Sequence, residues 1–109
     1  MQEIVEHLRV KVRQGQYRLT IHAEKEREAD QITRREMEEA VLSEQCEVLE
    51  DYLTDPRGHS CLVLGSTQNN LPLHLVCGHL SEEEFIVITI YRPDPEQWID
   101  WRMRKESSP

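Results

Sequence analysis

The chain has 109 residues, of which 38% are hydrophobic and 31% charged, and this length and composition fit one domain with a modest core. Its 13 basic and 21 acidic side chains give a net charge of −8. That balance argues against broad nonspecific binding to nucleic acid, because phosphate contacts need clustered lysine and arginine. We expect a single domain over residues 1–105 and a disordered tail over residues 106–109.

The sequence also predicts a cytoplasmic protein that does not contact a membrane. No apolar run approaches the roughly 20 residues of a membrane span, and the polar N-terminus does not resemble a signal peptide. The three cysteines, Cys46, Cys61 and Cys77, lie far apart and form no C-x-x-C pair, which is typical of reduced thiols.

The first part of the chain has the pattern of two helices joined by a short strand. Apolar residues at helical spacing over residues 2–13, followed by Gly15, predict the first helix. Alternation of apolar and polar residues over residues 17–21 predicts a strand. This strand continues directly into a second helix that begins near His22 and ends around residues 30–31.

A third helix is predicted by a capping box, in which Thr33 caps the helix and Glu36 reaches back to the backbone. We expect it to end near Ser43. Together with the preceding helix it could form a DNA-binding helix-turn-helix. Its glutamates would repel DNA phosphates, and they are Glu36, Glu38, Glu39 and Glu44.

From residue 46 onward the pattern changes to that of strands. The predicted strands are residues 48–53, 60–67, 73–80 and 85–91. Trp98 and Trp101 are spaced i, i+3 within residues 97–104, which predicts a closing helix or turn. The order is an N-terminal helix, a strand, two helices and then a four-stranded antiparallel meander, which predicts an α+β domain.

The faces of this sheet depend on the hairpin around Asn69 and Asn70. A two-residue turn there would place Leu64 opposite Leu75. The core face would then carry Leu62, Leu64, Leu73, Leu75, Cys77, Ile86, Ile88 and Ile90. The opposite, partly polar face would carry Cys61, Val63, His74, Val76, Val87, Thr89 and Tyr91.

The same register decides a metal hypothesis. The pairs His59-x-Cys61 and Cys77-x-His79 have the residue types of a Cys₂His₂ zinc site. With a two-residue turn the two pairs lie on opposite faces, whereas a three- or five-residue loop would bring them onto one face. We therefore expect no metal, no cofactor and no disulfide between Cys61 and Cys77.

The partly polar face carries the residue types that phosphodiester cleavage needs. His74 supplies an imidazole, Tyr91 a phenol, and Arg92 a guanidinium at the end of the strand, with Thr89 beside them. These groups could accept a proton, donate a proton and stabilise the charge of a phosphorane. The alternative is an ordinary sheet face, because His, Thr and Tyr also suit exposed strands.

A second candidate group lies where the strand meets the helix at His22. The helix dipole disfavours the charged imidazole there, which would leave a neutral base. Alternatively, His22 caps the helix or simply faces water. Arg27 has two interpretations as well, since it could anchor a phosphate or pair with Glu24 one turn back.

Three segments, residues 17–27, the capped helix from Thr33, and residues 87–93, together resemble a bacterial family of domains of unknown function that is distantly related to the RelE/ParE toxins. The resemblance implies a RelE-like scaffold of the barnase-EndoU-colicin-RelE type. It also implies a toxin of a toxin–antitoxin pair, which acts as an endoribonuclease on messenger RNA and is often encoded beside a small zinc-finger antitoxin. The family positions that map here are His22, Arg27, Thr89 and Tyr91.

We therefore predict a metal-independent RNA-cleaving domain. His22 or His74 is the predicted base and Tyr91 the acid or phosphate ligand. The predicted substrate-binding residues are Arg27, Thr89 and Arg92. The expected partners are RNA or the ribosome and a small zinc-finger antitoxin, and a homodimer is left open.

The alternative is a non-catalytic protein-binding module on the same scaffold. It is favoured by the charge distribution along the chain. Residues 36–100 hold fourteen acidic and two basic side chains, whereas residues 101–109 hold three basic and one acidic. An acidic middle segment suits a protein partner better than RNA.

Overall fold

The computed structural model describes residues 2–56, 58–80 and 82–106. Its helices are α1 (Gln2–Arg13), α2 (Ile21–Ala29) and α3 (Arg34–Leu42). Its strands are β1 (Tyr17–Leu19), β2 (Glu47–Tyr52), β3 (Ser60–Ser66), β4 (Pro72–Gly78), β5 (Phe85–Tyr91), β6 (Trp98–Ile99) and β7 (Met103–Arg104). Within the described ranges no helix is long and apolar enough to cross a membrane. The expected tail over residues 106–109 lies, apart from Glu106, outside the described residues.

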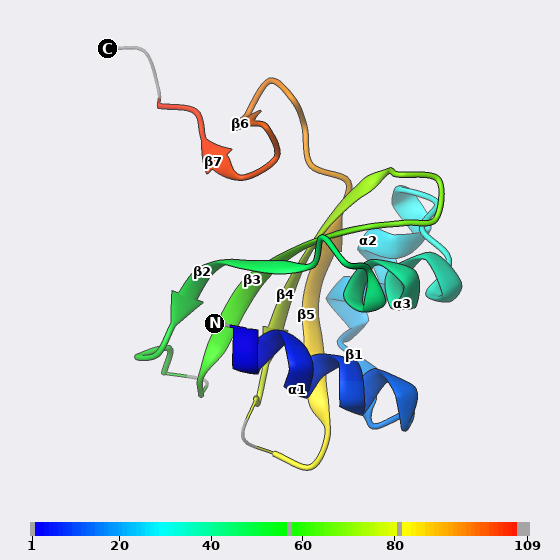
Figure 1. Cartoon of the computed structure of the whole chain (residues 1–109), viewed down its shortest axis with the longest axis vertical. Coiled ribbons are helices and arrows are strands. Elements are labelled where there is room, and N and C mark those ends of the chain that lie inside the picture. Colours follow the sequence, from blue (N-terminus) through cyan, green and yellow to red (C-terminus); the bar gives the residue numbers. More distant parts are fainter. Residues whose placement is uncertain (1, 57, 81, 107–109) are drawn as a thin grey trace.

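Five strands form one sheet in the order β1-β5-β4-β3-β2, and β6 pairs with β7 in a separate hairpin (Figure 1). Only β1 runs parallel to its neighbour, β5, and the other pairs in the sheet are antiparallel. The predicted α+β class is confirmed. The predicted strand count is wrong, because β1 joins the sheet as a fifth strand and residues 98–104 form a hairpin.

The helix starts follow the capping signals in the sequence. The capping box of Thr33 and Glu36 is present at the start of α3, as predicted. Thr20 caps α2, since its side chain accepts a hydrogen bond of 3.0 Å from the backbone N–H of Ala23. The alternative in which His22 caps this helix is therefore wrong.

The β3–β4 hairpin has a register one residue away from the prediction. Leu64 lies opposite His74 rather than opposite Leu75. The reason is the loop, which has three residues closed by the backbone N–H of Thr67 and ends with Asn70 at a φ of +60°. Only one of the two asparagines adopts the left-handed conformation, and the two-residue turn would need it at both.

This register and a bulge in β5 decide which side chains the helices cover. One residue of β5, Ile88, has no partner between Val76 and Cys77 of β4, so the predicted Ile86, Ile88 and Ile90 set does not share a face. The helix-covered face carries Cys61, Val63, Leu73, Leu75, Cys77, Phe85, Val87 and Ile90. The other face, here called the open face, carries Leu62, Leu64, His74, Val76, Thr89 and Tyr91.

The same register brings Cys61 directly opposite Cys77 under the helices. Both thiols are free and fully buried, and burial raises the pKa of Cys61 to about 12. Nε2 of His59 binds Asp51. Within the described ranges, no group of three or more His, Cys, Asp or Glu residues could hold a metal ion.

Beyond the end of β1, side chains of helix α2 and its C-cap pair with the free backbone edge of β5. Glu26 accepts a hydrogen bond of 3.1 Å from the backbone N–H of Ile90, and Asp30 accepts one of 3.0 Å from that of Arg92. Four residues of a helix rise about 6 Å, and two residues of a strand about 6.6 Å. The two spacings match, so side-chain carboxylates on one helix face pair with alternate N–H groups of the strand.

Replacing Glu26 with alanine should lower the free energy of unfolding by about 1–3 kcal/mol, because the N–H of Ile90 loses its partner. Urea unfolding measures this change. The matched control is Glu28→Ala on the exposed side of α2, which should stay within about 0.5 kcal/mol of the unaltered chain. Equal losses in the two variants would contradict the pairing role of Glu26.

Candidate functional site

The structure brings three of the six predicted site residues together. His74 of β4 lies directly opposite Tyr91 of β5, and Thr89 is two residues along β5 on the same open face. His22 and Arg27 lie on α2, and Arg92 follows the end of β5. The open face therefore holds the pair that acid–base chemistry would need, and the α2 residues form a separate group.

His74 is the centre of the open face. It is 0% exposed, with Nδ1 3.1 Å from the Tyr91 hydroxyl and Nε2 2.7 Å from the backbone carbonyl of Trp101. A carbonyl oxygen only accepts, so Nε2 carries the proton and Nδ1 accepts from the Tyr91 hydroxyl. Burial lowers the pKa of His74, which keeps the imidazole neutral, and burial also raises the pKa of Tyr91.

A hairpin from the C-terminal part of the chain covers His74. We call residues 98–104 the strap, and Figure 1 shows it standing apart from the three helices. The Trp98 ring lies edge-on to the His74 ring, with the two centres 4.4 Å apart. Arg104 lies directly opposite Trp98 in the hairpin, and its guanidinium is 4.7 Å from the centre of the Trp98 ring. Trp98 is only 5% exposed, so the strap is packed onto the imidazole.

Charge pairs hold the strap to β2 at the edge of the sheet. Glu47 and Glu50 share the open face, because they lie opposite Leu64 and Leu62. Arg104 donates two hydrogen bonds of 3.0 and 3.1 Å to Glu50, which lower the pKa of this carboxyl. Arg102 forms an ion pair with Glu47. Glu50 is therefore a carboxylate beside the His74 and Tyr91 pair.

Sequence reasoning missed these charged residues. Glu50 and Arg104 are 54 positions apart, so no local pattern links them. One signal was available, since the acidic middle of the chain is followed by a basic end. Pairing of those two segments would have predicted contacts such as Arg104 with Glu50.

The α2 group is arranged differently from the prediction of a joint site. The His22 side chain is 67% exposed, and Nε2 lies 3.1 Å from Glu26. Among the described residues, no hydrogen bond or ring contact joins His22 to His74. Arg27 pairs with Glu24, as its second interpretation predicted, and also donates a hydrogen bond of 3.0 Å to the carbonyl of Ile32.

Arg92 binds the connection between α2 and α3. Its Nε donates to the carbonyl of Asp30 at 3.0 Å, and Nη2 donates to the carbonyl of Gln31 at 3.1 Å and to Glu36 at 3.4 Å. These bonds fasten the end of β5 to the turn between the helices. Phosphate binding by Arg27 and Arg92 stays a prediction, although most of their donors already have partners.

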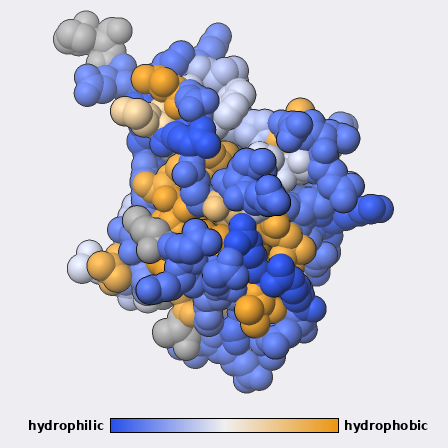
Figure 2. Space-filling model, in the orientation of Figure 1, coloured by the Kyte–Doolittle hydropathy of each residue, from blue (hydrophilic) through white to orange (hydrophobic). Residues whose placement is uncertain are grey.

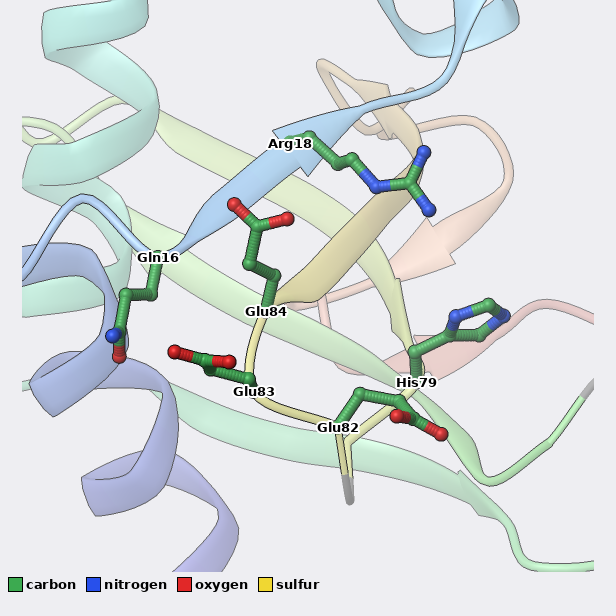
Figure 3. Close-up of a pocket in the computed structure, with 6 residues that line it drawn as sticks. All are labelled: Gln16, Arg18, His79, Glu82, Glu83 and Glu84. Atoms are coloured by element: carbon green, nitrogen blue, oxygen red, sulfur yellow. The ribbon is translucent and has the colours of Figure 1, made fainter.

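A hollow elsewhere on the surface gives no candidate site. It is lined by Gln16, Arg18, His79, Glu82, Glu83 and Glu84 (Figure 3). The carboxylates in Figure 3 point in different directions and do not converge on one point. An acidic hollow without convergent ligands is typical of a solvated surface.

The profile of the family described as Domain of unknown function (DUF4258) matches residues 19–92 of the chain, which is well over half of its length. The chain belongs to this family. No curated protein and no solved structure matches it. The DUF4258 match includes α2, His74 and Tyr91, whereas α1 and the strap lie outside it. The family description names no activity, so the DUF4258 site has to be argued from its own residues.

Stability should depend on pH in a way that reports the burial of His74. The folded state resists protonation of this histidine and the unfolded state does not, so stability is lost as pH falls below about 6.5. The loss cannot exceed about 1.4 kcal/mol per pH unit for one proton. Urea unfolding between pH 5 and pH 8 measures it.

The comparison that isolates His74 uses two variants. His74→Asn should remove this part of the pH dependence, while His22→Asn, which changes an exposed histidine, should keep it. An unchanged pH slope in His74→Asn would contradict the neutral, buried state of the imidazole.

Proposed function

We propose that the chain is a metal-independent endoribonuclease, the toxin of a toxin–antitoxin pair, and that its site is the open face beneath the strap. The observation that carries this proposal is the hydrogen bond between His74 and Tyr91, with the Glu50 carboxylate and the Arg104 guanidinium nearby. A RelE-like relationship of the fold is part of the proposal. It is supported by the chain order of a strand, two helices and four consecutive neighbouring strands.

The chemistry uses the 2′-hydroxyl of RNA as nucleophile. With the strap lifted, the Tyr91 oxygen can accept from Nδ1–H of His74, which leaves the Nε2 lone pair to take the 2′-hydroxyl proton. The 2′-oxygen attacks phosphorus and the P–O5′ bond breaks. The leaving O5′ takes the proton of the Tyr91 hydroxyl, and the Tyr91 oxygen takes the proton of His74 Nδ1 in its place. The products are a 2′,3′-cyclic phosphate and a 5′-hydroxyl.

Burial beneath the strap lowers the pKa of His74, so the imidazole is unprotonated when the strap lifts and can accept a proton. Arg104 would place a positive charge beside the phosphorane, where charge builds up. No step needs a metal ion or a cofactor. RNA, free or on the ribosome, would be the substrate, and a small zinc-finger antitoxin the protein partner.

A second function is favoured by the closed state of the strap. His74 is fully buried and both its ring nitrogens have partners, so its imidazole does not reach solvent in this arrangement. The strap also exposes an apolar pair, Ile99 at 51% and Met103 at 64%. The face seen in Figure 2 is mostly hydrophilic with separate apolar patches. These features suit a non-catalytic module that binds a protein partner or a second copy.

The purified chain should cleave labelled RNA in the presence of EDTA, with or without ribosomes, and leave 2′,3′-cyclic phosphate ends. Tyr91→Phe and His74→Asn should each reduce the rate by about 100-fold or more, because each removes a proton-transfer group. Thermal unfolding of both variants checks that the fold is kept. His22→Ala should cleave at the original rate.

Three other results would decide against the proposal. Loss of cleavage in His22→Ala but not in His74→Asn would move the site to α2. Cleavage of an all-deoxy strand would exclude the 2′-hydroxyl mechanism. Absence of cleavage with and without ribosomes would favour the non-catalytic binding module.

A further inference from the structure

We infer that Arg102 and Arg104 of the strap are the phosphate-binding residues of this site, and that an RNA backbone replaces Glu47 and Glu50 as their partners and so lifts the strap. The inference rests on the proposed function, since it names how RNA is held at the same open face. It replaces the predicted phosphate ligands, Arg27 and Arg92, with two arginines outside the family match.

The two pairs of arginines have different kinds of partner. Arg27 and Arg92 donate to backbone carbonyls of the folded chain, and a ligand cannot displace those without unfolding the turn between α2 and α3. Arg102 and Arg104 bind β2 through the side-chain carboxylates of Glu47 and Glu50, and their side chains are 44% and 62% exposed. Arg102 also donates to a backbone carbonyl, that of Asp100 at 3.3 Å, but this carbonyl belongs to the strap itself and moves with it.

A simple exposed ion pair contributes only about 0–1 kcal/mol, and a bidentate pair such as that of Arg104 and Glu50 contributes more. Another anion that offers the same bidentate geometry can still take the place of the carboxylate. Asp100, the other partner of Arg102 at 2.9 Å, moves with the strap and does not hold it to the sheet. An arginine can bind a phosphate through two parallel N–H donors, as Arg104 already binds Glu50. The carboxylates of Glu47 and Glu50 thus stand where RNA phosphates would bind.

The turn of the strap has a strained backbone. Its turn contains two consecutive residues in the left-handed region, Asp100 with φ of +52° and Trp101 with φ of +63°. This conformation is unfavourable for a bulky side chain such as that of Trp101. The Trp101 carbonyl is also the acceptor for His74 Nε2, so the strained residue makes the contact that closes the site.

Lifting of the strap would both release the two arginines and uncover His74. Lifting the strap separates Arg102 and Arg104 from Glu47 and Glu50, which frees their donors for phosphates, and it removes Trp98 and the Trp101 carbonyl from His74. The imidazole becomes accessible when phosphates arrive. The two indoles then face the bound strand, where aromatic rings stack on unpaired bases. This coupling also explains how a chain of net charge −8 could bind RNA at one place.

The test uses a fluorescein-labelled 2′-O-methyl RNA strand, which has no nucleophilic hydroxyl and stays intact. Anisotropy gives its affinity for the full chain at several salt concentrations. The slope of log affinity against log salt should become less steep by about 0.7 for each phosphate that no longer binds an arginine, or about 1.4 for Arg102→Gln with Arg104→Gln. Arg35→Gln is the control, because Arg35 is an exposed arginine paired with Glu39 on α3.

A second readout follows the strap itself. Both tryptophans of the chain lie in the strap, so quenching of their fluorescence by acrylamide reports its opening. Adding the 2′-O-methyl strand should increase quenching, and Glu47→Gln with Glu50→Gln should increase it without RNA. The Arg102→Gln, Arg104→Gln variant should show no RNA-dependent increase.

The outcomes separate the inference from the proposed function. If the strand binds and the double arginine variant keeps the original salt slope, the arginines do not bind phosphate and the inference is wrong, while RNA binding stands. If the strand binds without any change in quenching, the strap does not open and the inference is also wrong. If the strand does not bind the chain, the inference is wrong, and the cleavage assay with and without ribosomes decides the proposed function separately.

Discussion

A buried imidazole needs a partner for each ring nitrogen, and the arrangement of the open face depends on meeting this need for His74. The β3–β4 register turns His74 away from the helices, where Tyr91 supplies one partner from the neighbouring strand. The other partner must come from outside the sheet, and the Trp101 carbonyl provides it. The C-terminal residues thus fold back over the sheet and form the strap, instead of continuing into solvent.

The two faces of the sheet consequently differ in what covers them. The helix-covered face holds the core, including the free thiols of Cys61 and Cys77. The open face combines apolar side chains with the titratable groups of His74 and Tyr91, and the strap covers His74. His74 is fully buried and neutral beneath the strap, and the ion pairs of Arg104 with Glu50 and of Arg102 with Glu47 lie at its rim.

The α2 segment has a mainly structural role in this arrangement. Thr20 caps the helix, Glu26 and Asp30 pair with the edge of β5, and Arg27 supports the turn to α3. Each of these side chains bonds backbone atoms, so the segment is a signature of the fold. The part of the DUF4258 match that covers α2 therefore reports on the fold more than on chemistry.

Local patterns predicted what depends on local interactions. The periodicity of α1, the capping box of Thr33 and the β propensity of residues 85–91 are all set by neighbours within a few residues, and the structure confirms these two helices and this strand. The alternation predicted within β5 was wrong, because of the bulge at Ile88. The hairpin register was missed because Asn69 and Asn70 permit several loop lengths, and one residue of slip exchanges the faces. At residues 97–104 the turn was predicted as an alternative to a helix, and the structure has a turn, but the hairpin around it was missed for a related reason. Trp98 and Trp101 have helical spacing, yet two positive φ values turn the chain into a hairpin, and bonds such as that from Arg104 to Glu50 form only when the sheet exists.

On this account, RNA is bound and cleaved at the open face beneath the strap and not at α2. Nuclear magnetic resonance of the histidine rings and indoles, recorded during titration with 2′-O-methyl RNA, tests it most directly. We expect the largest changes at the His74 ring and the Trp98 indole, including loss of the hydrogen bond from Nε2–H, while the His22 ring keeps its signals. Changes confined to His22 and its neighbours on α2, with His74 and Trp98 unaffected, would contradict the claim.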